Sequence, residues 1–195
     1  MNQLHRLGLQ KHWIYEVLLS TFHDHTFHAA PIGVWTDGSD ALLMDVYDGS
    51  QTLANILETH ECVANFPADA GMLYTALRAP ERLAYAGARC VQAPIVADCT
   101  ATVELTVSSA TRRDDAVRIV GKVEGVDHAA APRLINRAEG LLLESLVLAT
   151  RLERGAREAA LTTLTENLRV VRKVAPRSVY ERALAALLQD LEPPS

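Results

Sequence analysis

The first 126 residues alternate short apolar runs with turn-forming residues, which is the pattern of β-strands. Asp24 and His25 indicate one turn, and the run Asp-Gly-Ser-Asp at 37–40 indicates another. The predicted strands cover residues 13–21, 28–36, 41–47, 61–66, 99–110 and 116–126. Because few helices separate them, the pattern favours an antiparallel barrel over a doubly wound parallel sheet.

Two short helices are predicted among these strands. Ser50 is a good N-cap for a helix over 51–60, because its hydroxyl can accept from free N–H groups of the first turn. Leu53, Ile56 and Leu57 fall on one face of this helix. The second helix is predicted over 70–79, ending before a proline.

Beyond Val126 the apolar spacing becomes helical. Pro132 suits the first turn of a helix that we expect to run to Arg154, with Gly155 as its stop. A second helix carries a leucine-rich stripe and is predicted to end before Pro176.

A third helix opens with a capping box, Ser178-Val-Tyr-Glu181. The run LLLESLVLAT around Leu142 and Leu146 is apolar nearly all round, which predicts that a second subunit covers part of it. The chain is therefore interpreted as a barrel domain over 1–126 and a three-helix subdomain over 127–195.

Composition narrows the function. The chain is 49% hydrophobic and 22% charged, with a net charge of -5, which argues against a nucleic-acid or anionic-membrane surface. The sequence has neither a signal-peptide pattern nor an apolar run long enough to span a membrane. Cys62, Cys90 and Cys99 form no C-x-x-C pair, so we interpret them as reduced core thiols of a cytoplasmic protein.

Three histidines, His23, His25 and His28, raise the possibility of a metal-dependent hydrolase. Metal ligands must converge, and His23 and His25 can share a strand face. His28 has the opposite parity and lies across a turn, so solvated hairpin histidines are the preferred interpretation and no metal is expected.

The run YDGSQTLANI is the first candidate ligand site, because a strand ends and a helix begins within a few residues. A helix start offers free N–H groups and the positive end of the helix dipole, which suit a phosphate. The alternative is an ordinary strand–turn–helix connection.

The run AAPIGVW is the second candidate. Proline and glycine weaken strand pairing, so the segment is expected at a sheet edge where a flat ring can meet backbone groups. A bulge that bends a barrel strand is the alternative.

Five segments in order, WIYEVLLST, AAPIGVW, LMDVYDGSQTLANI, ECVANFPAD and INRAEGLLLESLVLATRLE, resemble one family. This is the FMN-binding split-barrel family catalogued as domain of unknown function 447, which is related to flavin reductases and pyridoxamine-phosphate oxidases. The resemblance implies an α+β fold, an antiparallel split β-barrel followed by a C-terminal helical subdomain. It also implies a homodimer with FMN at or near the subunit interface.

The resemblance further implies which residues bind FMN. The phosphate and ribityl chain would be held by Gly49, Ser50, Thr52 and Asn55. The isoalloxazine ring would lie along Ala30, Pro31, Ile32 and Gly33, with Tyr47 lining the pocket. His25 and His28 depart from the turn glycine and asparagine-like residue expected there, and no catalytic residue is implied.

The implied function is an FMN-dependent oxidoreductase with a small molecule as substrate or electron donor. A reduced pterin is one candidate, because the family is associated with tetrahydropterin-dependent one-carbon metabolism. The alternative is a non-catalytic flavin-binding or dimeric scaffold protein, since a fold does not decide its function.

Overall fold

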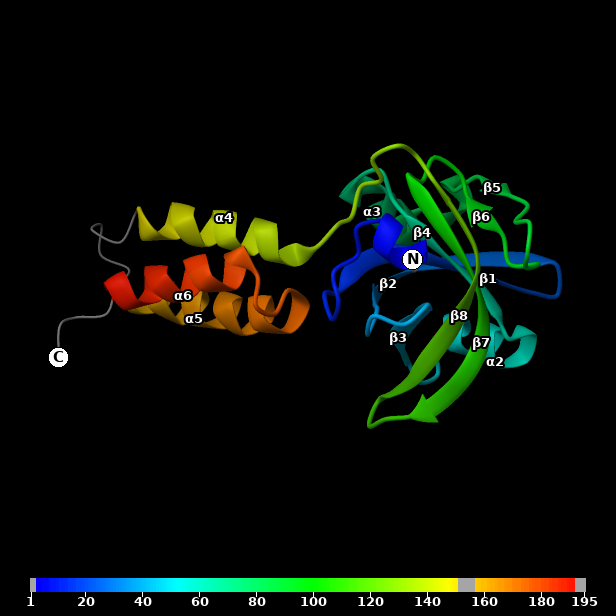
Figure 1. The fold of residues 1–195 in the computed structure, drawn as a ribbon, viewed down its shortest axis with the longest axis horizontal. Helices are drawn as coiled ribbons and strands as arrows, with labels where there is room; N and C mark the ends of the chain where they lie inside the picture. Colours follow the sequence, from blue (N-terminus) through cyan, green and yellow to red (C-terminus); the bar gives the residue numbers. More distant parts are fainter. Residues whose placement is uncertain (1–2, 151–156, 192–195) are drawn as a thin grey trace. The chain divides into compact units, whose positions relative to one another are not determined.

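The computed structural model describes residues 3–150 and 157–191. Packing divides the chain into two compact units (Figure 1). The barrel unit contains residues 1–11 and 15–135, and the helical unit contains residues 12–14 and 136–195.

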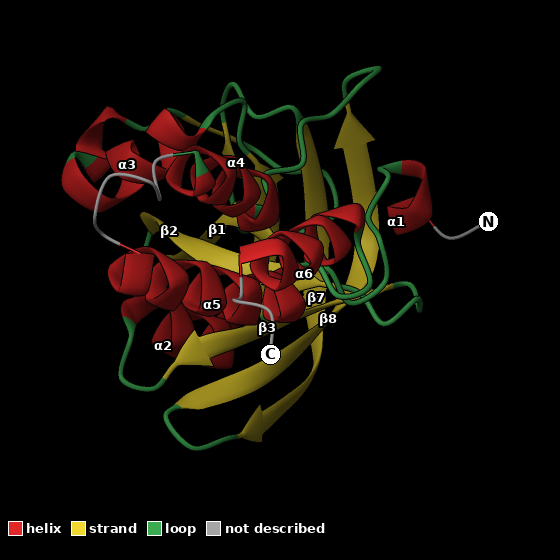
Figure 2. Ribbon diagram, turned by 90° about the vertical axis from the view of Figure 1, so that its left-hand side faces the viewer, coloured by secondary structure: helices red, strands yellow, loops and turns green. Residues whose placement is uncertain are grey.

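Six antiparallel strands of the described residues form a closed barrel, drawn in yellow in Figure 2. They are β1 (Tyr15–His23), β2 (Thr26–Trp35), β3 (Ala41–Tyr47), β4 (Glu61–Phe66), β7 (Ala101–Arg112) and β8 (Ala116–His128). Their order around the barrel is β1-β2-β3-β8-β7-β4, and β4 returns to pair with β1. The predicted antiparallel barrel is confirmed.

Strand periodicity explains the barrel interior. On β3, Leu42, Met44 and Val46 are fully buried, whereas the alternate residues Asp45 and Tyr47 are exposed. The other strands contribute similar inward-facing residues, among them Val17, Leu19, Val34, Val103, Leu105 and Ile119. Side-chain alternation on β3 thus separates the barrel interior from its outer surface.

The helices of the barrel unit are α1 (Gln3–Arg6), α2 (Gln51–Thr59) and α3 (Ala70–Arg78), followed by the short 3₁₀ helix η1 (Pro80–Arg82). A small hairpin adds β5 (Tyr85–Ala86) and β6 (Ile95–Val96). The predictions of α2 and α3 are confirmed. The Asp69 carboxylate caps α3 by accepting from the N–H groups of Gly71 and Met72.

The loop between β5 and β6 folds around the buried carboxylate of Glu104, which is 5% exposed. This carboxylate accepts hydrogen bonds from the N–H groups of Arg89, Cys90 and Val91, at 2.5–3.2 Å. Nearby, the Glu61 carboxylate accepts a single bond from the exposed Gln92 N–H, at 2.7 Å. Ionised acceptors strengthen such bonds, so Glu104 is the main support of this loop.

The start of β1 differs from the prediction. Residues 13 and 14 were predicted as strand but belong to the helical unit. The Ile14 N–H donates to the carbonyl of Val174 at 2.9 Å, and the Trp13 ring lies 6.0 Å from that of Tyr180. Both residues carry apolar side chains that suit a strand or a helix-packing segment, so their pattern alone does not distinguish the two.

The helical unit contains α4 (Arg137–Ala149), α5 (Arg157–Val174) and α6 (Val179–Leu191). Its core is formed by Ala138, Leu164, Leu168, Val171, Val174, Ala175 and Leu184. The predicted start of α4 at Pro132 is wrong, because Asn136 caps the helix through its side chain and the Ala138 N–H, at 2.7 Å. The predicted end at Arg154 and Gly155 lies outside the described residues.

The start of α6 contains half of the predicted capping box. The Ser178 hydroxyl accepts from the Glu181 N–H at 3.1 Å, as predicted. The Glu181 carboxylate, however, accepts from the N–H of Arg177 at 2.7 Å, one residue earlier than in a standard box. Arg177 has a φ of +59°, and this left-handed turn brings its N–H to the carboxylate.

Two leucines of α4 lie on an exposed apolar face. Leu143 is 60% exposed and Leu146 is 46% exposed, whereas Leu142 packs against the helical core. In the part of the chain that the structure describes, none of the helices is both long and apolar enough to cross a membrane.

Candidate functional site

The barrel opens where β2 and β3 separate. Within the described residues these strands pair only at Val34–Met44 and Trp35–Leu43. β3 pairs with β8 along its whole length, whereas residues 26–33 of β2 pair only with β1. One edge of β2 therefore presents unpaired backbone groups toward the opening.

The start of α2 lies just beyond the end of β3. Gly49 has a φ of +74°, and a Cβ there would meet open space. The Ser50 hydroxyl caps the helix by accepting from the Leu53 N–H at 3.2 Å. The N–H groups of Gln51 and Thr52 have no acceptor among the described residues. The helix start therefore offers donors and a positive dipole end to an anion.

Side-chain hydrogen bonds tie α2 to the barrel strands. Thr52 is 2% exposed, and its Oγ1 lies 3.0 Å from Nε2 of His28 on β2. The Asn55 amide donates to the Thr21 hydroxyl of β1 at 3.0 Å and accepts from the Gln51 amide at 2.6 Å. The start of α2 is thereby fixed beside the unpaired edge of β2.

Two arginines reach this end of the barrel from the β7–β8 hairpin. Arg112 forms an ion pair with Asp48, which precedes Gly49 in the turn before α2. Arg118 donates to Asp45 through two nitrogens, one of them at 2.8 Å. Both arginines come from far along the chain, so local motifs gave no sign of them.

The three histidines lie differently from the prediction. His25 and Asp24 form the two-residue turn between β1 and β2, with φ values of +61° and +44°. His23 pairs with Thr26 and His28 with Thr21, and cross-strand partners share a face. His23 and His28 therefore lie on one face, and the expectation that His23 and His25 share one is wrong. The described residues contain no cluster of three potential metal ligands.

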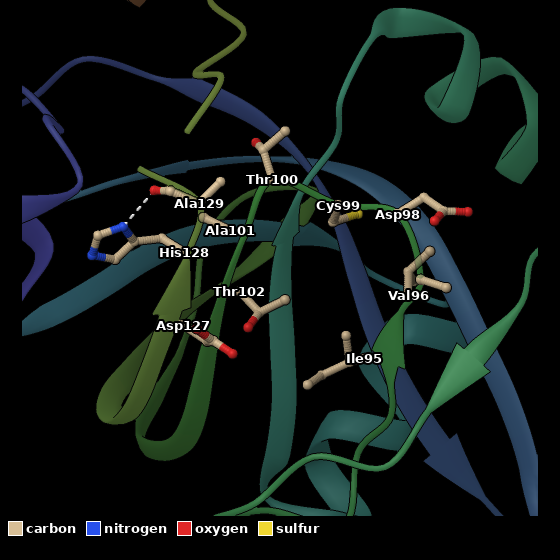
Figure 3. Close-up of a pocket in the computed structure, with 11 residues that line it drawn as sticks. Ile95, Val96, Asp98, Cys99, Thr100, Ala101, Thr102, Asp127, His128 and Ala129 are labelled. Atoms are coloured by element: carbon tan, nitrogen blue, oxygen red, sulfur yellow. Dashed lines mark hydrogen bonds between the residues drawn. The ribbon is translucent and has the colours of Figure 1, made fainter. Parts of the chain in front are cut away.

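A separate hollow of about 330 Å³ lies at the other ends of β7 and β8 (Figure 3). Asp98 and Cys99 line it from the segment before β7, and Asp127 and His128 from the end of β8. Burial raises the pKa of the Cys99 thiol to about 12, so this sulfur is protonated at neutral pH and is a poor nucleophile. His128 contacts the carbonyl of Ala129, at 2.7 Å.

The prediction of core thiols is confirmed for one cysteine and wrong for another. Cys62 is fully buried on β4, and burial raises its pKa to about 12. Cys90 is exposed on the loop that Glu104 supports, whereas Val91 and Ala93 of the same loop are buried against Val63.

Two family models together match most of the chain. Residues 15–128 match the N-terminal domain of a protein of unknown function (DUF447), and residues 136–189 match a second model of that family. The chain belongs to the DUF447 family. A comparison with curated proteins gave no match.

Solved structures share the fold of this DUF447 protein. An FMN-bound DUF447 protein from Methanosarcina mazei is 19% identical, with a TM-score of 0.58 over 97% of this chain and 100% of its own. A flavoredoxin from Methanosarcina acetivorans is 18% identical, with a TM-score of 0.54 over 63% and 80%. An FMN-binding protein from Thermus thermophilus is 12% identical, with a TM-score of 0.53 over 58% and 70%. The predicted split-barrel fold is confirmed.

The DUF447 chain brings most of the site residues inferred from its sequence to one opening of the barrel. The start of α2 holds Gly49, Ser50, Thr52 and Asn55. The unpaired part of β2 holds Ala30, Pro31, Ile32 and Gly33. Tyr47 ends β3 and is 67% exposed. Sequence reasoning missed His28 as the residue that links the two groups, through Thr52.

Proposed function

We propose that this DUF447 protein binds FMN in the opening between β2 and β3 and acts as a flavin-dependent oxidoreductase. The observation that carries the proposal is the unpaired edge of β2 beside a helix start with two free N–H groups. The family and the FMN-bound structure from Methanosarcina mazei, which matches nearly the whole chain, support it.

The phosphate of FMN would sit at the start of α2. The N–H groups of Gln51 and Thr52 point from the first helical turn, and open space at Gly49 lets an anion approach the backbone. The Ser50 and Thr52 hydroxyls can donate two further hydrogen bonds. Arg112 lies close to this position, but its ion pair with Asp48 leaves little net positive charge there.

The isoalloxazine ring would lie along Ala30, Pro31, Ile32 and Gly33. A flavin ring carries both donors and acceptors at its edge, which match the free N–H and C=O groups of an unpaired strand. FMN supplies the hydride or electron transfer, and the protein binds the ring, orients it and tunes it through backbone contacts. This division of roles explains why no acid–base pair is needed in the opening.

The ligand released from the denatured protein tests the proposal. We expect mass spectrometry to find FMN, because the donors at the start of α2 form a compact site for one phosphate and the sequence has no dinucleotide fingerprint. FAD would contradict the proposed phosphate site, and the absence of any flavin, with no binding of added FMN, would overturn the proposal.

Flavin reduction distinguishes an enzyme from a non-catalytic flavin carrier. We expect anaerobic NADH or NADPH to bleach the visible absorption band of the bound flavin. A band that persists with both donors, but is bleached by dithionite, would instead favour a carrier or scaffold role.

We also propose that the protein is a homodimer in which α4 contributes apolar contacts. Leu143 and Leu146 are largely exposed in the single chain, although leucine side chains of this size favour burial. A second copy of the chain would cover this face.

Replacing Leu143 and Leu146 together with glutamate is therefore expected to convert the dimer to a monomer, measured by size-exclusion chromatography with light scattering. The change places charges in an interface that would have to desolvate them. Leu77→Glu is a matched control, because Leu77 is 66% exposed on α3 of the other unit. A wild-type protein that is monomeric at micromolar concentration would contradict the proposal.

A further inference from the structure

The proposed phosphate site has little positive charge of its own. Residues 13–77, which include β1, β2, β3 and α2, contain neither lysine nor arginine. Arg112 comes from β7, but it is already paired with Asp48, so the pair adds little net charge. A dianionic phosphate would therefore rely on the helix start unless another group becomes cationic.

His28 is the titratable residue that meets the start of α2. It lies on the unpaired part of β2, and its Nε2 is 3.0 Å from the Thr52 hydroxyl oxygen. Burial lowers the pKa of His28, so the ring is neutral near pH 7 in the ligand-free protein. The residue is thus uncharged but one hydrogen bond away from the proposed phosphate position.

Because His28 and Thr52 share a hydrogen bond, the direction in which the Thr52 hydroxyl donates determines whether Nε2 of His28 must carry a proton. A threonine hydroxyl has one hydrogen. If that hydrogen is donated to a phosphate oxygen, the hydroxyl oxygen can only accept from His28, and Nε2 must then carry a proton. The neutral Nε2–H tautomer and the imidazolium both meet this requirement, but only the imidazolium also places a positive charge near the phosphate.

We propose that His28 binds a proton when the phosphate of FMN binds, so that the His28 imidazolium supplies the missing positive charge through Thr52. This inference rests on the proposed FMN site. It makes the affinity for the phosphorylated flavin depend on pH, whereas the affinity for riboflavin would not depend on His28 in this way.

His28 fits this role better than the other titratable side chains around β2. The elements packed against β2 carry Tyr15, Glu16, His23, Asp45, Tyr47, Glu58, Tyr74, Arg78 and Tyr85 as titratable side chains. Tyr85 lies against Phe27, and burial raises its pKa. Glu58 is paired with His23, and Asp45 with Arg118. Glu16 lies opposite Gly33, at the far end of β2 from His28. Tyr47, Tyr74 and Arg78 are exposed.

The sign of the pH dependence follows from the pKa of His28 in the two states. The pKa is below its ordinary value in the free protein, and a nearby dianion raises it in the complex. Between these two values, FMN binding takes up a proton and affinity rises as pH falls. Each unit of difference corresponds to about a tenfold change in affinity across that window. Protonation of the phosphate itself has the opposite effect, because it weakens binding below about pH 6.

Isothermal titration calorimetry near neutral pH measures this uptake directly. The protein is first freed of flavin by dialysis against concentrated potassium bromide, then titrated with FMN in two buffers of different ionisation enthalpy. We expect a fraction of a proton, and at most one, to be taken up per FMN. His28→Gln keeps a hydrogen-bonding group for Thr52 but does not titrate, so it should bind FMN without this uptake.

Two controls isolate the effect. His25→Asn changes a histidine of the same hairpin that is exposed and has a left-handed φ, which asparagine tolerates, so uptake should persist. Riboflavin lacks the phosphate, so its binding should take up no proton through His28. FMN binding without proton uptake, or with uptake that persists in His28→Gln, would overturn the role of His28 and leave the FMN site standing. Absence of FMN binding at any pH would overturn both.

Discussion

Replacing Ser50 and Thr52 together with alanine is expected to reduce the affinity for FMN by on the order of a hundredfold or more. Each substitution would remove one hydrogen bond between a hydroxyl and the charged phosphate, and such bonds contribute about 1.5–3 kcal/mol each. Thr52→Ala also removes the partner of His28 Nε2. The measurement is a fluorescence titration of FMN into the flavin-free variant, after circular dichroism has shown that it is folded.

A stability effect must be separated from a binding effect, because Ser50 also caps α2. Loss of an N-cap costs about 1 kcal/mol of folding free energy. Asp69→Ala is a matched control, since Asp69 caps α3 of the same unit without lying at the opening. It should lower stability and leave FMN affinity unchanged. Unchanged affinity in the folded Ser50–Thr52 double variant would mean that the phosphate lies elsewhere.

The largest loss of stability is expected for Glu104→Ala. The substitution leaves the N–H groups of Arg89, Cys90 and Val91 without their buried carboxylate acceptor. Burying unsatisfied donors and losing bonds to an ionised group should lower the free energy of unfolding of the barrel unit by about 3–5 kcal/mol. The loop between β5 and β6 should become more susceptible to proteolysis as a result.

The two tryptophans allow this loss to be assigned to one unit. Trp13 lies in the helical unit and Trp35 in the barrel unit, so a Trp13→Phe background leaves fluorescence that reports the barrel alone. Glu61→Ala is the control, because Glu61 accepts only one bond, from the exposed Gln92 N–H, and should cost about 1 kcal/mol or less. Equal urea midpoints for the Glu104 and Glu61 variants would contradict the support role of Glu104.

The sequence predicted those parts of the fold that depend on local patterns. The predicted strands Ala41–Tyr47 and Glu61–Phe66 matched β3 and β4 to the residue, and Ser50 marked the start of α2. The predictions failed where the structure depends on which segment of the chain a residue packs against. Trp13 and Ile14 are apolar enough for a strand, yet they pack against the core of the helical unit.

The candidate site, too, could be predicted only where it depends on local sequence. The edge character of AAPIGVW followed from its proline and glycine, but the contact between His28 and Thr52 joins residues 24 positions apart in the sequence. The pairing of Arg112 with Asp48 spans 64 positions. The misassigned histidine faces had a similar cause, because counting residues along a strand ignores the turn at Asp24 and His25, which sets the register of the hairpin.

The unpaired edge of β2 has a further consequence for the protein during synthesis and storage. An open strand edge with free N–H and C=O groups is a template on which another chain can add a strand and begin to aggregate. Pro31 cannot donate a backbone hydrogen bond, but the neighbouring alanine, isoleucine and glycine carry no charge that would discourage pairing. A bound flavin would cover the same groups. We therefore expect cells short of riboflavin to accumulate this protein in inclusion bodies, and riboflavin added to the medium to restore its soluble yield.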